Sequence, residues 1–296
     1  MDTNLIELME KFNSEDRCRE YIEQLRWPSG VCCTRCGSVS VSRIKKRNQY
    51  ECNDCRYQFS PMAGTVFHDT HLPLTKWFLA VYLMCESKKG MSASQISRTL
   101  GIGYKAAWYL CHRIREAMKC DESELLKGII EADETYVGGA YDKRRKRGPR
   151  EKPCVVGVIQ RGGPVRAKKV RSSGARSLSA FLKASVDPKA HLMTDEYAGY
   201  KKIGREFAGH SVVKHSALQY VEGMAHTNSI ENFWSLFKRG VVGSFHKVSE
   251  KHLDRYIGEF AYRFNGRKDD ELFAQTIRNL VNGEALPFQK LTKNAA

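Results

Sequence analysis

Long apolar runs and acidic residues are both scarce in this chain. The longest uninterrupted apolar run is the nine residues 77–85, about half of the ~18 needed to cross a bilayer, so it predicts a buried helix segment. The N-terminal segment is charged and has no apolar stretch of the kind found in signal peptides. Hydrophobic residues make up 42% of the chain, which excludes extensive disorder. We expect a soluble, cytoplasmic protein with two or three domains.

The shortage of acidic residues leaves a large positive surplus. Lys and Arg total 49 against 33 Asp and Glu, giving a net charge of +16. A surplus of this size favours a polyanionic partner, and nucleic acid is the commonest one. For a nucleoid-associated protein, which we expect this to be, that partner is double-stranded DNA. A basic surface that serves only solubility is the alternative. An anionic membrane is disfavoured because no long basic amphipathic helix is visible.

Five of the ten cysteines lie within the 24 residues 32–55. Cys33 and Cys36 form one CxxC pair, Cys52 and Cys55 form another, and fifteen residues separate the pairs. This spacing is typical of one tetrahedral Zn²⁺ held between two turns joined by a hairpin. Four thiolates close the coordination sphere, so the predicted site is structural. Cys32 has the wrong spacing and is interpreted as a bystander.

The segment 28–62 therefore predicts a zinc ribbon, and 1–27 a helical segment before it. Tyr50, Tyr57 and Phe59 can pack around a metal site that is too small for a core of its own. Basic residues between the cysteines favour a DNA-contacting module, although a solvated charged face has the same composition.

Residues 73–120 have the pattern of a helix-turn-helix. A helix is expected over 74–87, a second begins near a Ser92 cap, and the turn 101–103 contains two glycines. A third helix over about 104–119 would be the one that enters the major groove. Lys105, Trp108 and Arg113 are candidate DNA contacts there. An ordinary helical hairpin is the alternative.

Beyond residue 119 the pattern changes to short apolar runs separated by turns. Strands are expected over 128–139, 152–163, 164–170, 191–200 and 210–216, and helices over about 176–186 and 226–240. The first three strands form an antiparallel meander. The fold class is therefore α/β.

Three acids in this region stand out by their positions. Asp133 lies on the first strand, Asp195 ends a later one, and Glu231 lies on the helix 226–240. This order would gather carboxylates at one edge of a ribonuclease-H-like mixed sheet, where they would suit Mg²⁺ or Mn²⁺. On a helical wheel, Ile230, Phe233 and Phe237 share one side, and an opposite stripe holds Asn228, Glu231, Ser235 and Lys238. Taken singly, each Asp is better explained as a turn or cap residue, and Glu231 with Lys238 as an exposed ion pair.

Several motifs in register extend along nearly the whole chain. They are CTRC…CNDC, GTVFHDTHLPLTKW, the helix-turn-helix, ADETYVGG, TDEYAGY and HTNSIENFWSLFKRG. In this order they resemble the bacterial insertion-sequence DDE transposases of the zinc-ribbon group, the ISXO-type relatives of Merlin elements.

The resemblance implies roles for individual residues. Asp133 and Asp195 would be the first two catalytic metal ligands, and Glu231 the third. Asn228, three residues earlier on the same face, is the alternative third ligand. Lys238, with Arg239 beside it, would contact DNA.

A basic run follows the first of these strands. Residues 143–150 hold six positive side chains in eight positions, and they predict a loop on the DNA backbone, with a solvated loop as the alternative. The candidate DNA contacts in it are Lys143, Arg144, Arg145, Lys146 and Arg147.

The sequence thus predicts a DNA transposase that binds terminal inverted repeats and catalyses metal-dependent strand cleavage and transfer, as a homodimer or larger assembly on DNA. Its catalytic domain is expected at 125–275, with a C-terminal tail at 276–296. A non-catalytic zinc-containing DNA-binding regulator and a nuclease of the same fold are the rival hypotheses.

Overall fold

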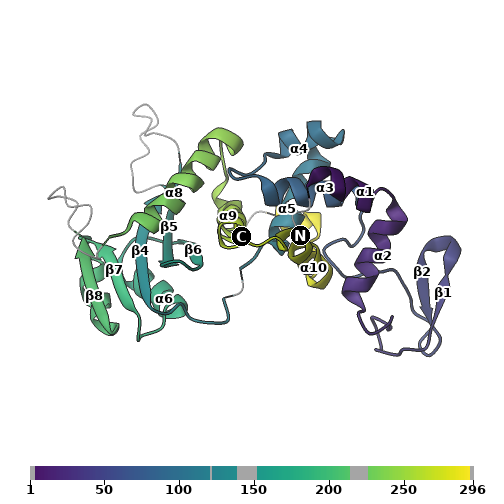
Figure 1. The fold of residues 1–296 in the computed structure, drawn as a ribbon, viewed down its shortest axis with the longest axis horizontal. Helices are drawn as coiled ribbons and strands as arrows, with labels where there is room; N and C mark the ends of the chain where they lie inside the picture. The colour runs from purple at the N-terminus through teal and green to yellow at the C-terminus, as the bar shows by residue number, and fades with distance from the viewer. Residues whose placement is uncertain (1–3, 121, 139–151, 214–225, 294–296) are drawn as a thin grey trace. The chain divides into compact units, whose positions relative to one another are not determined.

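The computed structural model describes residues 4–120, 122–138, 152–213 and 226–293. The chain forms two compact units. The helical unit comprises residues 1–87, 91–118 and 269–296, and the sheet unit comprises residues 88–90 and 119–268. Figure 1 shows the course of the chain in each unit. Within the described residues, no helix is both long and apolar enough to span a membrane.

The helical unit begins with two short helices and a small sheet. The helices are α1 (Leu5–Lys11) and α2 (Glu15–Arg26), capped by the side chains of Asn4 and Ser14. The antiparallel sheet has the order β1-β2-β3 and comprises β1 (Val41–Ile44), β2 (Gln49–Cys52) and β3 (Gln58–Phe59). A 3₁₀ turn, Lys45–Arg47, joins β1 to β2, which is the hairpin predicted between the two CxxC pairs.

The ribbon has only a small core. Trp27, Tyr50, Phe59 and two of the cysteines are buried in it, with Tyr57 packed against them. So few apolar residues bury too little surface to hold this segment folded without a cross-link or a metal.

Three further helices follow the pattern predicted from the sequence. They are α3 (Leu74–Glu86), α4 (Ala93–Leu100) and α5 (Tyr104–Ala117). The Ser92 hydroxyl accepts from the Gln95 amide and caps α4, and Gly101, at φ 59°, ends it in the left-handed conformation. The side chains expected on the inner face of α5 are buried, among them Ala107, Leu110 and Ile114.

The C-terminal residues fold with the helical unit. They form α10 (Leu272–Asn282) and α11 (Phe288–Thr292). The Val66 amide donates to the Leu280 carbonyl, and Asn279 donates to the Ala117 carbonyl. The boundary expected between 275 and 276 thus falls inside α10, and the described residues after it include the rest of α10 and all of α11.

The sheet unit is built on a five-stranded mixed sheet of order β6-β5-β4-β7-β8. Its strands are β4 (Ile129–Tyr136), β5 (Cys154–Gln160), β6 (Val165–Val170), β7 (His191–Asp195) and β8 (Gly209–Val213). β4, β5 and β6 form the predicted antiparallel meander, whereas β7 and β8 run parallel to β4. The first strand of the unit is therefore the central one.

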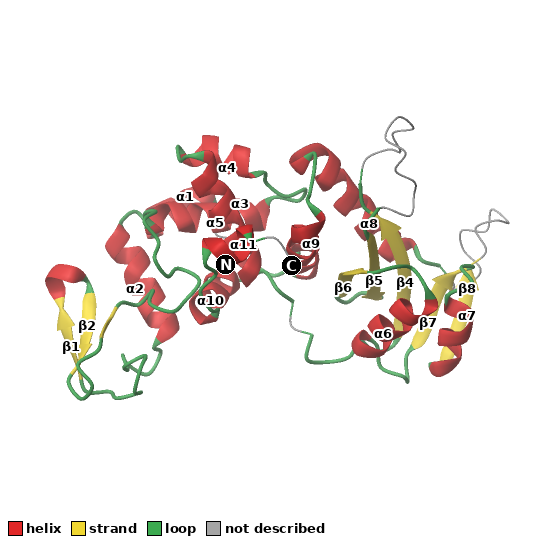
Figure 2. Ribbon diagram, turned by 180° about the vertical axis from the view of Figure 1, so that it is seen from behind, coloured by secondary structure: helices red, strands yellow, loops and turns green. Residues whose placement is uncertain are grey.

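Helices cover both faces of this sheet (Figure 2). They are α6 (Ala175–Ser185), α7 (Tyr200–Ile203), α8 (Asn228–Gly240) and α9 (Leu253–Asn265). Shorter turns are the 3₁₀ segments Gly204–Glu206 and Glu250–His252 and the π-helical Val241–Phe245. Leu178 and Leu182 of α6 pack on one face with Ile130, and Phe233 and Phe237 of α8 pack on the other.

Helix α8 has an apolar side and a polar side, as its helical wheel predicted. Its apolar side is buried, with Ile230 and Phe233 fully inaccessible. Asn228, Glu231 and Lys238 are exposed on the opposite side.

Candidate functional site

The four predicted zinc ligands come together. The ligand atoms of Cys33, Cys36, Cys52 and Cys55 all lie within 4.8 Å of one another. The sulfur atoms of Cys33 and Cys55 are 3.6 Å apart, and those of Cys36 and Cys52 are 3.5 Å apart. Sulfurs bound to one tetrahedral zinc at about 2.3 Å would be separated by about 3.8 Å, so the cluster fits this ion.

In each CxxC turn a backbone amide, as well as the cysteine sulfurs, points toward the cluster. The Arg35 amide lies 3.4 Å from the Cys33 sulfur, and the Cys55 amide 3.5 Å from the Cys52 sulfur. Such donors stabilise thiolate charge. Cys32 is only partly buried beside the ribbon core and stands outside the group of four. The cluster is thus a structural zinc site in its composition and spacing.

Asp133 and Asp195 lie on neighbouring parallel strands. β4 and β7 pair with Ile129 opposite His191 and Glu131 opposite Met193. Each residue of β4 thus pairs with the β7 residue 62 positions later in the chain. Continued for two more residues, this register places Asp133 opposite Asp195 at the end of β7. Because side chains alternate along a strand, both carboxylates emerge on the same face of the sheet.

Glu231 approaches this edge from α8, which packs on that face. Its carboxylate accepts a hydrogen bond from the Thr227 hydroxyl at 2.6 Å. Asn228 is exposed one turn earlier. Helical spacing of three residues keeps Asn228 and Glu231 on one stripe, so either side chain can face the two aspartates.

The neighbouring acids affect the ionisation of Asp133. Its pKa is raised from 3.8 to about 7, first by burial and then by the negative charges of Glu134, Asp195 and Glu231. A cation bound nearby would offset this repulsion and stabilise the ionised form of Asp133. Among the residues that the structure describes, only the cysteines are gathered as tightly as 4.8 Å in a group of three or more potential ligands.

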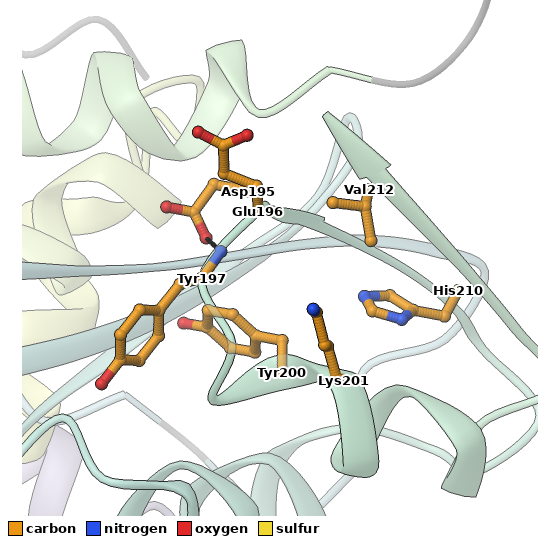
Figure 3. Close-up of a pocket in the computed structure, with 7 residues that line it drawn as sticks. All are labelled: Asp195, Glu196, Tyr197, Tyr200, Lys201, His210 and Val212. Atoms are coloured by element: carbon orange, nitrogen blue, oxygen red, sulfur yellow. Dashed lines mark hydrogen bonds between the residues drawn. The ribbon is translucent and has the colours of Figure 1, made fainter. Parts of the chain in front are cut away.

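Glu134 lies on the other face of β4. Its carboxylate accepts a hydrogen bond from the buried Tyr200 hydroxyl at 2.7 Å, and burial raises its pKa. Tyr200 also lines a hollow together with Asp195, Lys201 and His210. Figure 3 shows the Asp195 carboxylate turned toward the Tyr197 amide, from which it accepts a hydrogen bond at 3.0 Å.

Sequence reasoning overlooked Glu131. This carboxylate is completely buried, and it accepts hydrogen bonds from the first turn of α8 and from Arg161. The available signal was its position two residues before Asp133, which places both side chains on one face of the same strand.

Comparisons with known proteins agree with this picture. Residues 125–265 match the family model described as ISXO2-like transposase domain, and residues 13–58 match the transposase zinc-ribbon domain. The chain is therefore similar to an ISXO2-like transposase domain preceded by a transposase zinc ribbon. The predicted family resemblance is thereby confirmed.

A relative from an archaeal insertion element supports the same assignment. It is described as an uncharacterized protein in transposable element ISH50 of Halobacterium salinarum. It is 29% identical to this chain over 277 residues, covering 85% of this chain and 91% of the relative. The similarity thus extends over most of both chains.

Helix α8 carries two of the predicted DNA contacts. Lys238 and Arg239 are both exposed. Lys238 lies seven residues after Glu231, two helical turns along the same stripe. The predicted contacts Lys143, Arg144, Arg145, Lys146 and Arg147 lie outside the described residues.

In the helical unit the predicted contacts have different environments. Lys105 is exposed, with its amine 5.0 Å from the centre of the Phe288 ring. Trp108 is half-buried, and its ring also packs edge-on against Phe288, at 6.1 Å between centres. Both lie on α5 beside the C-terminal helix α11.

The buried environment of Arg113 argues against its predicted contact with DNA. Its side chain is only 3% exposed, and it donates hydrogen bonds to the carbonyls of Val66 and His68. The guanidinium also stacks on Trp77 and Tyr109, with 4.8 and 5.1 Å to the ring centres. The sequence shows Arg113 as one of several basic residues on this helix. It does not show that the carbonyls of Val66 and His68 would accept hydrogen bonds from its side chain.

Proposed function

We propose that this protein is an insertion-sequence transposase that binds the terminal inverted repeats of its element and then cleaves and joins DNA strands. The observation that carries the proposal is the level arrangement of Asp133 and Asp195 on one face of β4 and β7. The raised pKa of Asp133, due to burial and to the neighbouring acids, supports it. So do the family matches to a transposase domain and a transposase zinc ribbon.

The sheet topology supports a ribonuclease-H-like fold. Numbered from β4, the strands have the order 3-2-1-4-5, with the first three antiparallel and the last two parallel to the first. The resemblance to DDE transposases implies this topology, with one acid on the first strand and another at the end of the fourth. Asp133 and Asp195 occupy those two places.

We assign Asp133, Asp195 and Glu231 as the residues that would hold Mg²⁺ or Mn²⁺, with Asn228 as the alternative to Glu231. Hard divalent cations prefer carboxylate oxygens. Bound there, such ions would supply the charge that activates an attacking oxygen and stabilises a leaving one in phosphodiester displacement. Glu231 is favoured over Asn228 because a carboxylate also neutralises charge.

The proposed reaction has two balanced steps. Water attacks a phosphodiester at the end of the element, leaving a 5′-phosphate on one side and a 3′-hydroxyl on the other. That hydroxyl then attacks a phosphodiester of target DNA and displaces a second 3′-hydroxyl. Lys238, exposed on the stripe of Glu231, would hold a phosphate of the terminal nucleotides by charge.

Recognition of the ends is assigned to the helical unit. Helices α4 and α5, joined by the turn at 101–103, have the form of a helix-turn-helix whose second helix enters the major groove. Lys105 is the exposed basic residue near the start of α5. The zinc ribbon would add phosphate contacts. Two ends must be joined in one event, so we propose a homodimer or larger assembly on DNA.

An in vitro joining assay tests the function directly. Purified protein, Mg²⁺ and DNA carrying the ends that flank its own gene should give strand cleavage followed by joined products. Tight binding to the ends without cleavage would instead favour a non-catalytic regulator. Cleavage without joined products would favour a nuclease of the same fold.

A further inference from the structure

One buried carboxylate of the transposase domain has no part in the proposed chemistry. The side chain of Glu131 on β4 is 0% exposed. Its Oε2 accepts hydrogen bonds from the backbone amides of Ser229, at 2.8 Å, and Ile230, at 3.1 Å. Its Oε1 accepts one from the Ser229 hydroxyl at 3.0 Å. All of these donors belong to the first turn of α8.

The first turn of a helix needs acceptors from outside, because its amides have no partner within the helix. The residue that should supply one here is Thr227, and its side chain makes no capping hydrogen bond. The Thr227 hydroxyl donates to Glu231 instead. Glu131 therefore caps α8 from a neighbouring strand, and its negative charge also suits the positive end of the helix dipole.

A second group ties the same carboxylate to the loop after β5. The Arg161 guanidinium donates from Nε to Oε1 of Glu131 at 2.8 Å and from Nη2 to the His226 carbonyl at 2.9 Å. The His226 ring lies beside the same carboxylate, with 3.2 Å between Nδ1 and Oε1. The positive charge of Arg161 compensates for burial of the negative one.

These contacts fix the position of one candidate metal ligand relative to another. Glu131 and Asp133 are two residues apart on one strand and face the same way. Ser229, Ile230 and Glu231 are consecutive in α8. The distance from Asp133 to Glu231 is thus set by a short path that runs through the Glu131 carboxylate.

We propose that Glu131 is a positioning residue, which holds the first turn of α8 so that Glu231 and Asn228 face Asp133, and which thereby sets the affinity of this edge for divalent cations. The inference rests on the proposed function for the identity of the metal ligands. It assigns to Glu131 no contact with metal or DNA, because its oxygens are buried and already accept hydrogen bonds.

The same unit offers a matched control for a purely structural role. Glu259 on α9 is also 0% exposed and accepts a hydrogen bond from Arg263 at 3.1 Å. Both carboxylates therefore belong to buried ion pairs. Removing either charge should destabilise the unit, but only Glu131 contacts the start of α8.

The test compares full-length Glu131→Gln with Glu259→Gln and the wild type. Glutamine keeps the shape but turns one acceptor oxygen into a donor, so either the α8 amides or Arg161 will face an NH₂ group. We expect Glu131→Gln to lose hydrogen-exchange protection at Ser229 and Ile230. We also expect Mn²⁺ binding, titrated by calorimetry without DNA, to weaken about 10- to 100-fold, the usual cost of losing a group that orients metal ligands.

Glu259→Gln should keep both the wild-type Mn²⁺ affinity and the protection of the α8 amides, even if its melting temperature falls as much as that of Glu131→Gln. Wild-type Mn²⁺ affinity in folded Glu131→Gln would overturn the proposal, as would an equal loss in Glu259→Gln. If Glu131→Gln does not fold, Ser229→Ala removes only the hydroxyl donor. It should weaken Mn²⁺ binding in the same direction, and unchanged binding would overturn the proposal.

The measurements separate this inference from the proposed function. Asp133→Asn defines the Mn²⁺ binding that belongs to the acid site. A wild type that binds Mn²⁺ there but neither cleaves nor joins DNA would contradict the proposed function. The hydrogen-exchange and Mn²⁺-titration results would still test the positioning role of Glu131. If the wild type is active and Glu131→Gln keeps wild-type Mn²⁺ affinity and amide protection, the positioning role alone is contradicted.

Discussion

Asp133 on β4 and Asp195 at the end of β7 lie level with each other on adjacent parallel strands, with their side chains on the same face of the sheet. They are separated by 61 residues of chain, and the parallel pairing of the two strands is what brings them together. The charge of Asp195 is one of the causes of the raised pKa of Asp133.

The first prediction concerns pH. The pKa of Asp133 is raised from 3.8 to about 7, chiefly by burial. The folded protein therefore binds this proton more tightly than the unfolded chain, so metal-free stability should fall as pH rises between about 4 and 7. Asp133→Asn should melt at a higher temperature than the wild type at pH 8 and nearly equal to it at pH 4. Thermal melts without added divalent cations check this.

The same group should make metal binding pH-dependent. A carboxyl must lose its proton to bind a cation, so Mg²⁺ or Mn²⁺ affinity should rise up to about pH 7 and then level off. A metal affinity that stays constant from pH 5 to 8 would contradict the assignment of Asp133 as a ligand.

Zinc content gives the second prediction. Cys33→Ser removes one of the four clustered thiolates and should yield protein without zinc, a less ordered ribbon and weaker binding to the DNA ends. Elemental analysis of purified protein measures this. The neighbouring Cys32→Ser is the control and should keep its full zinc content. Loss of zinc in Cys32→Ser, or full zinc in Cys33→Ser, would refute the ligand set.

The third prediction uses the close approach of α8 to the sheet. Gly157 pairs with Asp133, and a β-carbon there would meet Trp234 at 2.6 Å. Gly157→Ala should cost about 1–3 kcal/mol of unfolding free energy through overpacking. It should also slow cleavage, because α8 carries Glu231. Gly243→Ala has open space around it and should change neither quantity, as denaturant titrations and cleavage rates can show.

The fourth prediction separates Lys105 from Arg113 on α5. Lys105→Ala should leave the melting temperature unchanged but weaken binding to DNA, with the salt dependence of log affinity reduced by about 1. Arg113→Ala should lower the melting temperature, since the carbonyls of Val66 and His68 lose their donor. Lower DNA affinity of Arg113→Ala at unchanged stability would instead show that Arg113 contacts DNA.

The elements of the sheet unit could be predicted because their patterns are local. The strand expected over 191–200 is found at His191–Asp195, and the helix expected over 226–240 is found at Asn228–Gly240. Apolar periodicity, glycine turns and a capping serine determine such elements within a few residues. The CxxC spacing likewise predicted the cysteine cluster.

The partners of buried polar groups could not be predicted in this way. Arg113 and Glu131 have the sequence context of an ordinary helix and an ordinary strand. Their roles depend on which distant groups the fold brings to them, the Val66 carbonyl for one and the Ser229 amide for the other. The C-terminal residues were expected to be a tail for the same reason, since α10 is held by contacts with residues more than a hundred positions away.

The most direct test of the account is cleavage of element-end DNA by Asp133→Asn and Asp195→Asn, with binding to the same DNA measured in parallel. We predict wild-type binding and no detectable cleavage or joining for both variants. Cleavage that survives either substitution would contradict the assignment of the two aspartates as the metal-binding pair. Loss of DNA binding together with cleavage would instead mark them as residues that maintain the fold.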